Sequence, residues 1–484
     1  MSFVDLIPWR NPIMSRLGEM FSAPNRLILI RAPSGVGKTS VAVAYAIWSA
    51  LHGERTAIFL RTKREVEHAL GIAGSILSRL DNPDILITPT PSRTEMCVMG
   101  YREIPIRFMC PAVDCERLAN RKISDIIKTL KGTTYDRLLA YKYIFSRGGR
   151  CPYIVARELL RRAHVVIGVH EYFSDSCLYS SLGELSTVII DEAHSFLLMR
   201  YEFSLRLLKR GETLASEFYD AGGRNLGRYI VALWREGRRN DSIALSQYYQ
   251  YMACEGEEIR VGDKILKVPT PIDIIRRRIR RLRRIIVMSS TLYPSSFFEV
   301  LFSKGLQHEM FVIPGIIGGR RIQVLDTKLS MGYNERNMET FRQYARLIRK
   351  IAEREKSKVI VFTPSYEVAK HVAKFLGVRP TDQFDQEIVV TVYRGKISEG
   401  IEPPPEYSVA ILAGLPYPKI NLEDIEVLKI YSKEYGISLD AMKKAYVESS
   451  MMSALIQAMG RVGRRGEGKV YIVDRRAMRI LGHR

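Results

Sequence analysis

The chain lacks a long hydrophobic run and the residue pattern of a signal peptide. No stretch of about 18 apolar residues occurs among its 484 residues, which excludes an ordinary membrane-spanning helix. The amino-terminal MSFVDLIPWRNP lacks the charged, apolar and small-residue regions of a signal peptide. We therefore expect a soluble, cytoplasmic protein that has no membrane partner.

Cysteine is scarce, and internal repeats and low-complexity segments are missing. Six cysteines in a chain of this length, without secretory features, do not suggest a disulfide framework. Four of them are confined to one stretch with the spacing C-x12-C-x4-C-x35-C, at Cys97, Cys110, Cys115 and Cys151. Four thiolates could hold zinc or a [4Fe–4S] cluster, although the paired C-x2-C hooks that zinc ribbons favour are absent. Four unrelated buried thiols are the plainer alternative.

Acidic residues are too few to balance the basic ones. Lys and Arg number 74 against 52 Asp and Glu, which gives a formal net charge of +22. This excess suits a polyanionic partner, because neutralised phosphates release condensed counterions. A heat-adapted surface would explain many charges but not their one-sided sign. The run RRRIRRLRR, residues 276–284, is either a solvated helix face or a strip that binds nucleic-acid backbone.

The apolar pattern predicts two α/β domains. A chain of 484 residues exceeds what one hydrophobic core usually serves. Apolar runs alternate with helical patterns over residues 26–90 and again from 164 to 194, which predicts a parallel sheet with helices on both faces. A helical, charged stretch with one hairpin follows, and the strand at 283–291 returns to the first sheet. A second alternating region runs from 321 to 475.

The run APSGVGKT, residues 32–39, leaves a predicted strand and opens a helix. Gly35 and Gly37 permit a tight turn whose backbone N–H groups face phosphates, Lys38 reaches the β- and γ-phosphates, and the Thr39 hydroxyl ligates Mg²⁺. Ala32 stands at the first glycine of the general pattern. The expected nucleotide-binding residues are Ala32, Pro33, Ser34, Gly35, Val36, Gly37, Lys38, Thr39 and Ser40.

The run DEAH, residues 191–194, follows an apolar strand. A carboxylate at the end of a buried strand can hold a metal ion, so Asp191 and Thr39 form the expected Mg²⁺ site. The adjacent Glu192 is placed to orient or deprotonate the attacking water. An acidic residue after a strand is weak evidence alone, but its position after a phosphate loop predicts hydrolysis of a nucleoside triphosphate.

A third motif, QAMGRVGR at residues 457–464, lies near the end of the second domain. Arg461 and Arg464 are expected one turn apart on a helix, so that both point the same way. A guanidinium supplied across a domain cleft stabilises charge developing on the γ-phosphate. A basic surface helix is the plainer interpretation, but the spacing of Gln457 and Gly460 favours catalytic roles for Gln457, Arg461 and Arg464.

These motifs, in this order, resemble superfamily-2 helicases, and five further segments narrow the resemblance to the XPD/DinG-type group. The segments are FLRTKREVE (59–67), MSSTLYP (288–294), VFTPSY (361–366), RGKISEGIEPP (394–404) and AGLPYP (413–418). The resemblance covers essentially the whole chain. It implies DNA contacts by Arg61, Thr62, Tyr172, Ser365 and Tyr366, and an ATP contact by Glu402, which stands where the family has Asp.

The resemblance also assigns the clustered cysteines. XPD-like helicases have an iron–sulfur domain between the phosphate loop and DEAH, and its last cysteine lies in a CPY sequence, as Cys151 does here. The implied ligands of a [4Fe–4S] cluster are Cys97, Cys110, Cys115 and Cys151. The gap between Cys110 and Cys115 is wider than the family's usual C-x2-C.

The expected fold is therefore α/β, with two RecA-like parallel-sheet domains, an inserted 4Fe–4S domain and a short, mainly helical arch domain. The first RecA-like domain is expected over 1–95, 153–196 and 283–316, and the second over 317–484. The iron–sulfur domain is expected over 96–152, and the arch-like insertion over 197–282.

The function implied by the resemblance to archaeal XPD is an ATP-dependent DNA helicase or translocase. It would move 5′→3′ on single-stranded or forked DNA in repair, with ATP, Mg²⁺ and a [4Fe–4S] cluster as cofactors. It would act as a monomer at the nucleoid, with protein partners from a repair assembly. Two alternatives stay open: a DNA-binding structural subunit with a vestigial ATPase, and an RNA helicase.

Overall fold

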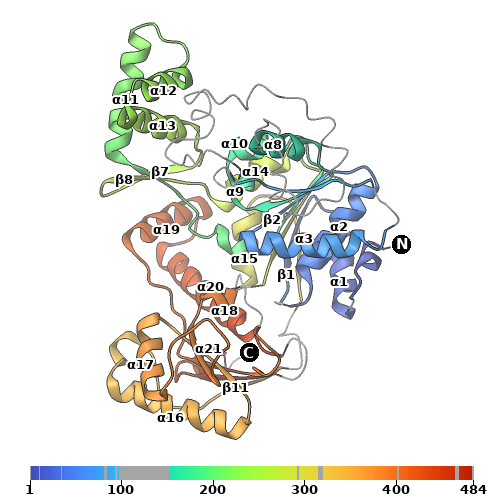
Figure 1. The fold of residues 1–484 in the computed structure, drawn as a ribbon, viewed down its shortest axis with the longest axis vertical. Coiled ribbons are helices and arrows are strands. Elements are labelled where there is room, and N and C mark those ends of the chain that lie inside the picture. Colours follow the sequence, from blue (N-terminus) through green and yellow to red (C-terminus); the bar gives the residue numbers. More distant parts are fainter. Residues whose placement is uncertain are drawn as a thin grey trace.

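The structure, a computed structural model, describes residues 2–9, 11–33, 35–80, 84–92, 96, 152–290, 294–313, 320–399, 403–463 and 468–481. Some predicted site residues lie outside the described residues, namely Ser34, Cys97, Cys110, Cys115, Cys151, Glu402 and Arg464. The described part contains two large parallel sheets, each covered by helices on both faces, and one small antiparallel sheet (Figure 1).

The first sheet has seven parallel strands in the order β10-β1-β9-β5-β2-β4-β3. Their bounds are β1 (Leu27–Arg31), β2 (Thr56–Leu60), β3 (Ile87–Pro89), β4 (Val165–Val169), β5 (Thr187–Ile190), β9 (Arg284–Ser289) and β10 (Glu309–Val312). The central strands are almost continuously apolar because helices cover both faces. Strand β9, although distant in sequence, lies between β1 and β5, and its Ile286 pairs with Ile28 and Ile189.

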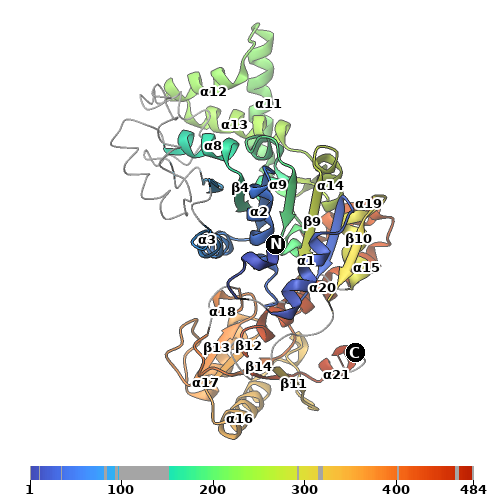
Figure 2. The same ribbon diagram turned by 90° about the vertical axis from the view of Figure 1, so that its right-hand side faces the viewer.

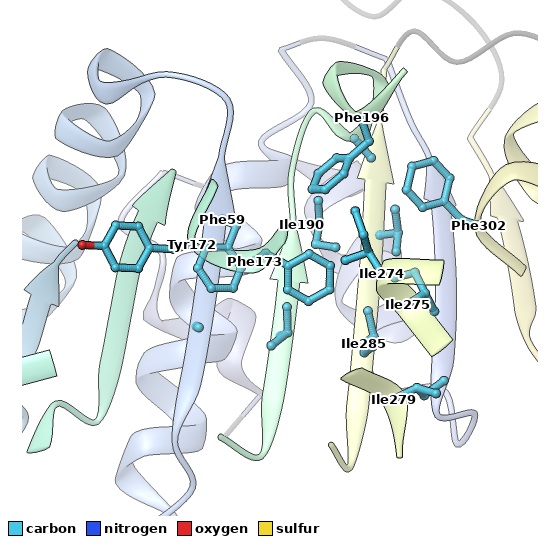
Figure 3. Close-up of a cluster of buried hydrophobic side chains, with 14 of the residues drawn as sticks. Phe59, Tyr172, Phe173, Ile190, Phe196, Ile274, Ile275, Ile279, Ile285 and Phe302 are labelled. Atoms are coloured by element: carbon cyan, nitrogen blue, oxygen red, sulfur yellow. The ribbon is translucent and has the colours of Figure 1, made fainter. Parts of the chain in front are cut away.

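Two layers of helices enclose this sheet and complete the first domain. One face is covered by η1 (Phe3–Leu6), α1 (Pro12–Phe21), α2 (Lys38–Leu51) and α3 (Lys63–Leu77). The other is covered by α8 (Pro152–Arg162), α9 (Glu171–Ser174), η3 (Ala193–Phe196), α14 (Pro271–Ile279) and α15 (Ser295–Ser303). The short α10 (Ser176–Ser180) follows α9. Figure 3 shows Ile274, Ile275 and Ile279 of α14 facing Ile190 and Ile285 of the sheet.

Residues 201–268 form a helical unit at the end of the molecule opposite the second sheet (Figures 1 and 2). Its helices are α11 (Leu205–Asp220), α12 (Leu226–Arg235) and α13 (Arg239–Ala253), and they enclose a separate core that includes Leu214, Ile230 and Leu245. Its antiparallel strands are β6 (Tyr201–Ser204), β7 (Glu257–Val261) and β8 (Lys264–Val268), in the order β6-β8-β7.

The second domain is built on five parallel strands in the order β11-β15-β14-β12-β13. They are β11 (Arg320–Val324), β12 (Val359–Thr363), β13 (Ile388–Val392), β14 (Val409–Ala413) and β15 (Gly468–Val473). Helices α16 (Met338–Glu355) and α17 (Tyr366–Leu376) cover one face, and η4 (Tyr333–Glu335) precedes α16. The other face is covered by α18 (Lys396–Glu399), the second half of α20 (Leu439–Met459) and α21 (Ala477–Leu481).

Helix α19 (Leu422–Tyr435) belongs to the second domain by sequence but packs against the first. Val427, Leu428 and Tyr431 share one core cluster with Phe196 and Ile275 of the first domain. The first half of α20 joins the same cluster through Met442. One continuous helix therefore connects the two domains.

The predicted fold class is confirmed, with two RecA-like parallel sheets and a mainly helical insertion. The inserted 4Fe–4S domain stays a prediction, because it falls almost entirely outside the described residues. The apolar runs did not predict the edge strand β10 or the third strand of the small sheet, β6. Both are short and only partly buried, so neither has a strong apolar pattern.

Candidate active site

The phosphate loop joins the end of β1 to the beginning of α2. Gly35 has a φ of +84° and Gly37, the N-cap of α2, has a φ of +90°. An L side chain is strained at such angles, so glycine lets the chain turn sharply from strand to helix. The first N–H groups of α2 and the positive end of its dipole therefore face the loop.

Lys38 is the first residue of α2, and its side chain bends back into the loop. Its Nζ donates hydrogen bonds to the carbonyls of Ala32 and Pro33, each at 3.1 Å. Lys38 is only 5% exposed, although an ammonium group is more stable in water than in a protein interior. A buried ammonium enclosed by a phosphate loop provides a local positive charge for an anionic ligand.

Thr39 and Asp191 are brought together by the order of the strands. Thr39 follows β1 and Asp191 follows β5, and these strands are separated only by β9. Thr39 Oγ1 donates a hydrogen bond of 2.6 Å to Asp191 Oδ2. Asp191 is 2% exposed, and burial raises its pKa, as does the charge of Glu192, while Lys38 and Thr39 oppose the rise.

Glu192 is held in a strained conformation, with a left-handed φ of +50°. The Ser290 hydroxyl, which follows β9, lies 3.1 and 3.2 Å from its two carboxylate oxygens. His194 Nδ1 lies 3.2 Å from Oε2. Burial alone would raise the pKa of Glu192, but His194, Lys38 and the Ser290 hydroxyl together lower it. The side chain is therefore ionised at neutral pH and can accept a hydrogen bond from water.

His170 supports this pair of carboxylates, and the sequence motifs did not indicate it. Its Nε2 lies 2.8 Å from the carbonyl oxygen of Asp191, and its Nδ1 lies 2.5 Å from Ser195 Oγ. Because a carbonyl only accepts, Nε2 holds the proton and Nδ1 accepts from Ser195. Burial lowers the pKa of His170 to about 3, so the ring is neutral. Its position directly after a buried strand was the available signal.

The predicted helix at residues 457–464 is wrong in part. Gln457 is buried near the end of α20, but that helix ends at Met459 with Gly460 as its C-cap. Gly463 has a φ of +71°, which a helix does not allow. Arg461 therefore lies in the turn after α20. Arg464 lies outside the described residues, so the relation between the two guanidinium groups is untested.

Two pairs of residues predicted to contact DNA lie at the carboxyl ends of strands, one pair in each domain. Thr62 follows β2 and caps α3, and Glu65 Oε2 accepts hydrogen bonds from the backbone N–H groups of Arg61 and Thr62. Ser365 follows β12 and caps α17, where its Oγ accepts from a backbone N–H. Tyr366 is next to it and is 61% exposed.

Tyr172 does not occupy the exposed position expected of a DNA contact. The residue is 6% exposed and belongs to the buried cluster that Figure 3 shows beside Phe59 and Phe173. Its hydroxyl donates a 2.8 Å hydrogen bond to the carbonyl of Pro91. Packing on the sheet accounts for the aromatic ring, and the bond to Pro91 accounts for the hydroxyl.

The described ranges contain no other arrangement suited to a metal ion, since no three His, Cys, Asp or Glu side chains converge there. None of the helices in these ranges has the length and hydrophobicity needed to cross a membrane. Lys38, Thr39, Asp191 and Glu192 place the candidate active site at the carboxyl edge of the first sheet, which is where open α/β sheets bind ligands.

Comparison with known proteins agrees with this geometry. A family model described as DEAD_2 matches residues 59–203, and one described as Helicase C-terminal domain matches residues 381–480. A curated relative, the ATP-dependent DNA helicase XPD of Sulfolobus acidocaldarius, is 23% identical over 220 residues. That alignment covers 40% of this chain and 39% of the relative, so it spans about two fifths of the relative's length.

Solved structures of XPD proteins share the fold. A structure of an XPD helicase matches with a TM-score of 0.66 and 17% identity, over 97% of this chain and 96% of that chain. The structure of S. tokodaii Xpd4 matches with a TM-score of 0.58 and 16% identity, over 97% and 96% of the two chains. These likenesses show the fold, and the two family models, over residues 59–203 and 381–480, make the chain similar to XPD-like superfamily-2 helicases in both domains.

Proposed function

We propose that this chain is an ATP-dependent DNA helicase or translocase. The observation that favours this function most is the 2.6 Å hydrogen bond between Thr39 and Asp191 beside the buried Lys38. It places a hydroxyl, a carboxylate and an ammonium at one end of a phosphate loop. The relatives named as XPD helicases support DNA as the nucleic acid.

The residues at the phosphate loop fit ATP and Mg²⁺. Magnesium prefers oxygen ligands and is usually bound by one or two carboxylates together with substrate phosphates. Thr39 Oγ1 and Asp191 Oδ2 offer two such oxygens side by side. Bound there, Mg²⁺ would neutralise charge on the β- and γ-phosphates. Lys38 would turn from the loop carbonyls to the same phosphates.

Glu192 is the residue that we assign to the attacking water. Its ionised carboxylate is restrained by Ser290 and lies beside His194, so it can orient a water molecule and accept its proton. His170 holds the carbonyl of Asp191 and thereby orients the strand end that presents both carboxylates. Across the cleft, Gln457, Arg461 and Arg464 would contact the γ-phosphate and stabilise the charge that develops on it.

Single-stranded DNA would run across both domains near Arg61, Thr62, Ser365 and Tyr366. The exposed ring of Tyr366 offers a surface for base stacking, which tolerates any sequence. Closing and opening of the cleft would then move the strand. We further propose 5′→3′ movement on single-stranded or forked DNA, a role in repair with partner proteins, and action as a monomer at the nucleoid.

A [4Fe–4S] cluster on Cys97, Cys110, Cys115 and Cys151 is part of the same proposal. Its support is the confinement of four thiols to one segment and the family resemblance. Protein purified without oxygen should be brown and contain about four irons per chain. A colourless protein with one zinc ion would contradict the cluster and leave the ATP site unaffected.

The ATP site is tested by hydrolysis with single-stranded DNA, with RNA and with no nucleic acid. Lys38→Ala and Glu192→Gln should each lower the DNA-stimulated rate by about a hundredfold or more, because each removes a charge used in the reaction. Arg346→Ala, on the outer face of α16, should retain the wild-type rate. Full activity of either site variant would refute the assignment.

The same assay separates the alternatives. Stimulation by RNA rather than DNA would favour an RNA helicase, and no stimulation by either would favour a structural subunit. Duplexes with either a 5′ or a 3′ single-stranded tail then test the direction. Unwinding that requires a 3′ tail would contradict the proposed polarity.

A further inference from the structure

A groove lined by arginine crosses the amino ends of the strands in the first sheet. Arg55 precedes β2, Ser186 precedes β5 and Leu282 precedes β9, and all three line the groove. The phosphate loop and the DEAH run follow the carboxyl ends of strands in the same sheet. The groove and the candidate active site therefore lie at opposite ends of the sheet.

The groove consists of two adjoining hollows on either side of the end of α14. One has a volume of about 1360 Å³ and is lined by α10, residues 183–186 and α14. The other measures about 580 Å³ and includes Arg26 and Leu306. Arg280 lines both hollows. Seven arginines face two glutamates across the two hollows, which leaves a formal excess of five positive charges.

Some of these arginines have structural roles. Arg55 donates hydrogen bonds to the carbonyls of Leu160, Ala163, Leu182 and Glu184. It thereby connects its own segment before β2 with the end of α8 and with the residues after α10. Arg276 pairs with Glu434 of α19. Arg278 donates to Phe173 and Ser176, and its guanidinium lies 4.1 Å from the centre of the Tyr179 ring. Packing explains these side chains without any ligand.

Arg277, Arg280 and Arg281 are different. Nη1 of Arg277 pairs with Glu255, but its Nε and Nη2 are buried and have no hydrogen-bond partner within the part of the chain that the structure describes. A buried donor without a partner is unfavourable, because it has lost its hydrogen bonds to water. Arg280 and Arg281 are exposed, and neither forms an ion pair with a carboxylate in the described ranges. The exposed guanidinium groups of Arg280 and Arg281 therefore line the groove without a carboxylate partner among the described residues.

The helix dipole accounts for only part of this charge. Cations at the end of a helix are stabilised by its negative pole, which favours Arg276, Arg277 and Arg278 in the last turn of α14. The same pole also favours Arg280 and Arg281, which directly follow the helix, but it does not account for Arg26 on a different segment. The positive charges of these arginines repel one another, and an anion bound between them would offset that repulsion.

We propose that this groove binds the phosphate backbone of DNA, a contact that rests on the proposed DNA-dependent function. The planar fork of a guanidinium matches a phosphate and can bind it through two hydrogen bonds. The combined hollows are far larger than one phosphate ion, which favours a chain of phosphates. The groove's single aromatic residue, Tyr179, is covered by Arg278, so the contact should not involve base stacking or sequence preference.

The test is DNA binding by fluorescence anisotropy at several salt concentrations. Labelled single-stranded and duplex DNA, both long enough to span the molecule, identify which form occupies the groove. The variant is Arg280→Glu combined with Arg281→Glu, since both side chains are exposed and should not affect folding. The control is Arg346→Glu combined with Lys350→Glu on α16, which makes the same change in net charge at two exposed positions.

We expect the groove variant to bind at least one DNA form about tenfold more weakly than the control at low salt. The slope of log affinity against log salt concentration should fall by about two. Equal binding and equal slopes in the two variants would overturn the proposal. Unchanged DNA binding with lost binding of a polyglutamate peptide would instead assign the groove to an acidic protein.

The experiments distinguish failure of the groove proposal from failure of the proposed function. Wild-type protein that hydrolyses ATP in response to DNA, while the groove variant binds DNA like its control, would refute the groove alone. Wild-type protein with neither DNA binding nor DNA-stimulated hydrolysis would refute both. Equal thermal unfolding midpoints of the two variants would show that their folds are comparably stable.

Discussion

Glu65 connects the candidate DNA contacts with the candidate active site. It accepts hydrogen bonds from the backbone N–H groups of Arg61 and Thr62, and its pKa is raised to about 7. Burial is the main cause, and the charges of Glu192 and Asp191 add to it, while Arg61 opposes the rise. The proton on Glu65 therefore depends on the charge of the ATP-binding carboxylates.

We predict that Glu65 makes the protein without nucleotide less stable as the pH rises. A carboxyl group whose pKa is higher in the folded state stabilises the fold below its unfolded pKa of about 4.5, and this stabilisation is lost as the pH rises through about 7. The loss is at most about 3 kcal/mol.

Chemical denaturation between these pH values measures the effect. Glu65→Gln should flatten the profile while its side-chain oxygen still accepts the capping hydrogen bonds. The exposed Glu367→Gln on α17 serves as a control and should retain the wild-type slope. An unchanged slope in the Glu65 variant would contradict the raised pKa.

Other residues at the site show why sequence motifs identify only some of the residues of a site. Lys38, Thr39 and Asp191 were predicted because their motifs are local in sequence. His170 and Ser290 were not predicted as site residues, because each acts through a strand neighbour rather than a sequence neighbour. Tyr172 was expected to contact DNA but lies buried in the core, and aromatic residues serve in cores and in base stacking alike.

At the scale of elements, α20 is a rigid link between two cores. Met442 near its beginning packs in the first-domain cluster, whereas Met451, Leu455 and Met459 pack on the second sheet. Gln457 lies near its end. We infer that a displacement of the first domain relative to the second would be transmitted to Gln457 and to Arg461, which follows the helix.

We predict that loosening α20 between its two cores slows hydrolysis more than it weakens nucleotide binding. Glu448 lies between the two packed segments, and glycine there costs about 1 kcal/mol relative to alanine in a helix. If this cost raises the activation free energy of hydrolysis by the same amount, Glu448→Gly should hydrolyse ATP about fivefold more slowly than Glu448→Ala. Steady-state kinetics of the matched pair measure this, and equal turnover numbers would refute the link.

At the scale of the whole molecule, α19 joins the two domains through buried and charged contacts. Tyr431 donates to the carbonyl of Phe196, and Tyr435 donates to Leu301 and accepts from the Ile272 N–H group. Ion pairs also connect α19 with the rest of the molecule. Arg200 pairs with Glu423 and Asp424, and Lys264 also pairs with Glu423. Arg276 pairs with Glu434, and Glu257 pairs with Lys433.

We therefore predict that the two domains unfold together. The shared core means that loss of one domain exposes apolar surface of the other, so calorimetry should show one transition where independent domains would give two. Tyr431→Phe combined with Tyr435→Phe should lower stability by about 1–3 kcal/mol for each backbone group left unpaired. Two resolved transitions in the wild-type protein would contradict the prediction.

The sequence by itself determined the local parts of this protein. Strand and helix patterns depend on side chains a few residues apart, and the phosphate loop depends on glycines and a lysine within one turn. The run of arginines at 276–284 also indicated, from the sequence alone, an anionic partner.

Only the tertiary structure decided which of those residues meet. It placed His170 on Asp191, buried Tyr172, ended α20 before Arg461 and packed α19 on the first domain. It also separated arginines that serve packing from Arg280 and Arg281, whose exposed side chains line a groove. The reason is physical, since hydrogen bonding and burial depend on neighbours across strands and domains, and such neighbours lie far apart in the chain.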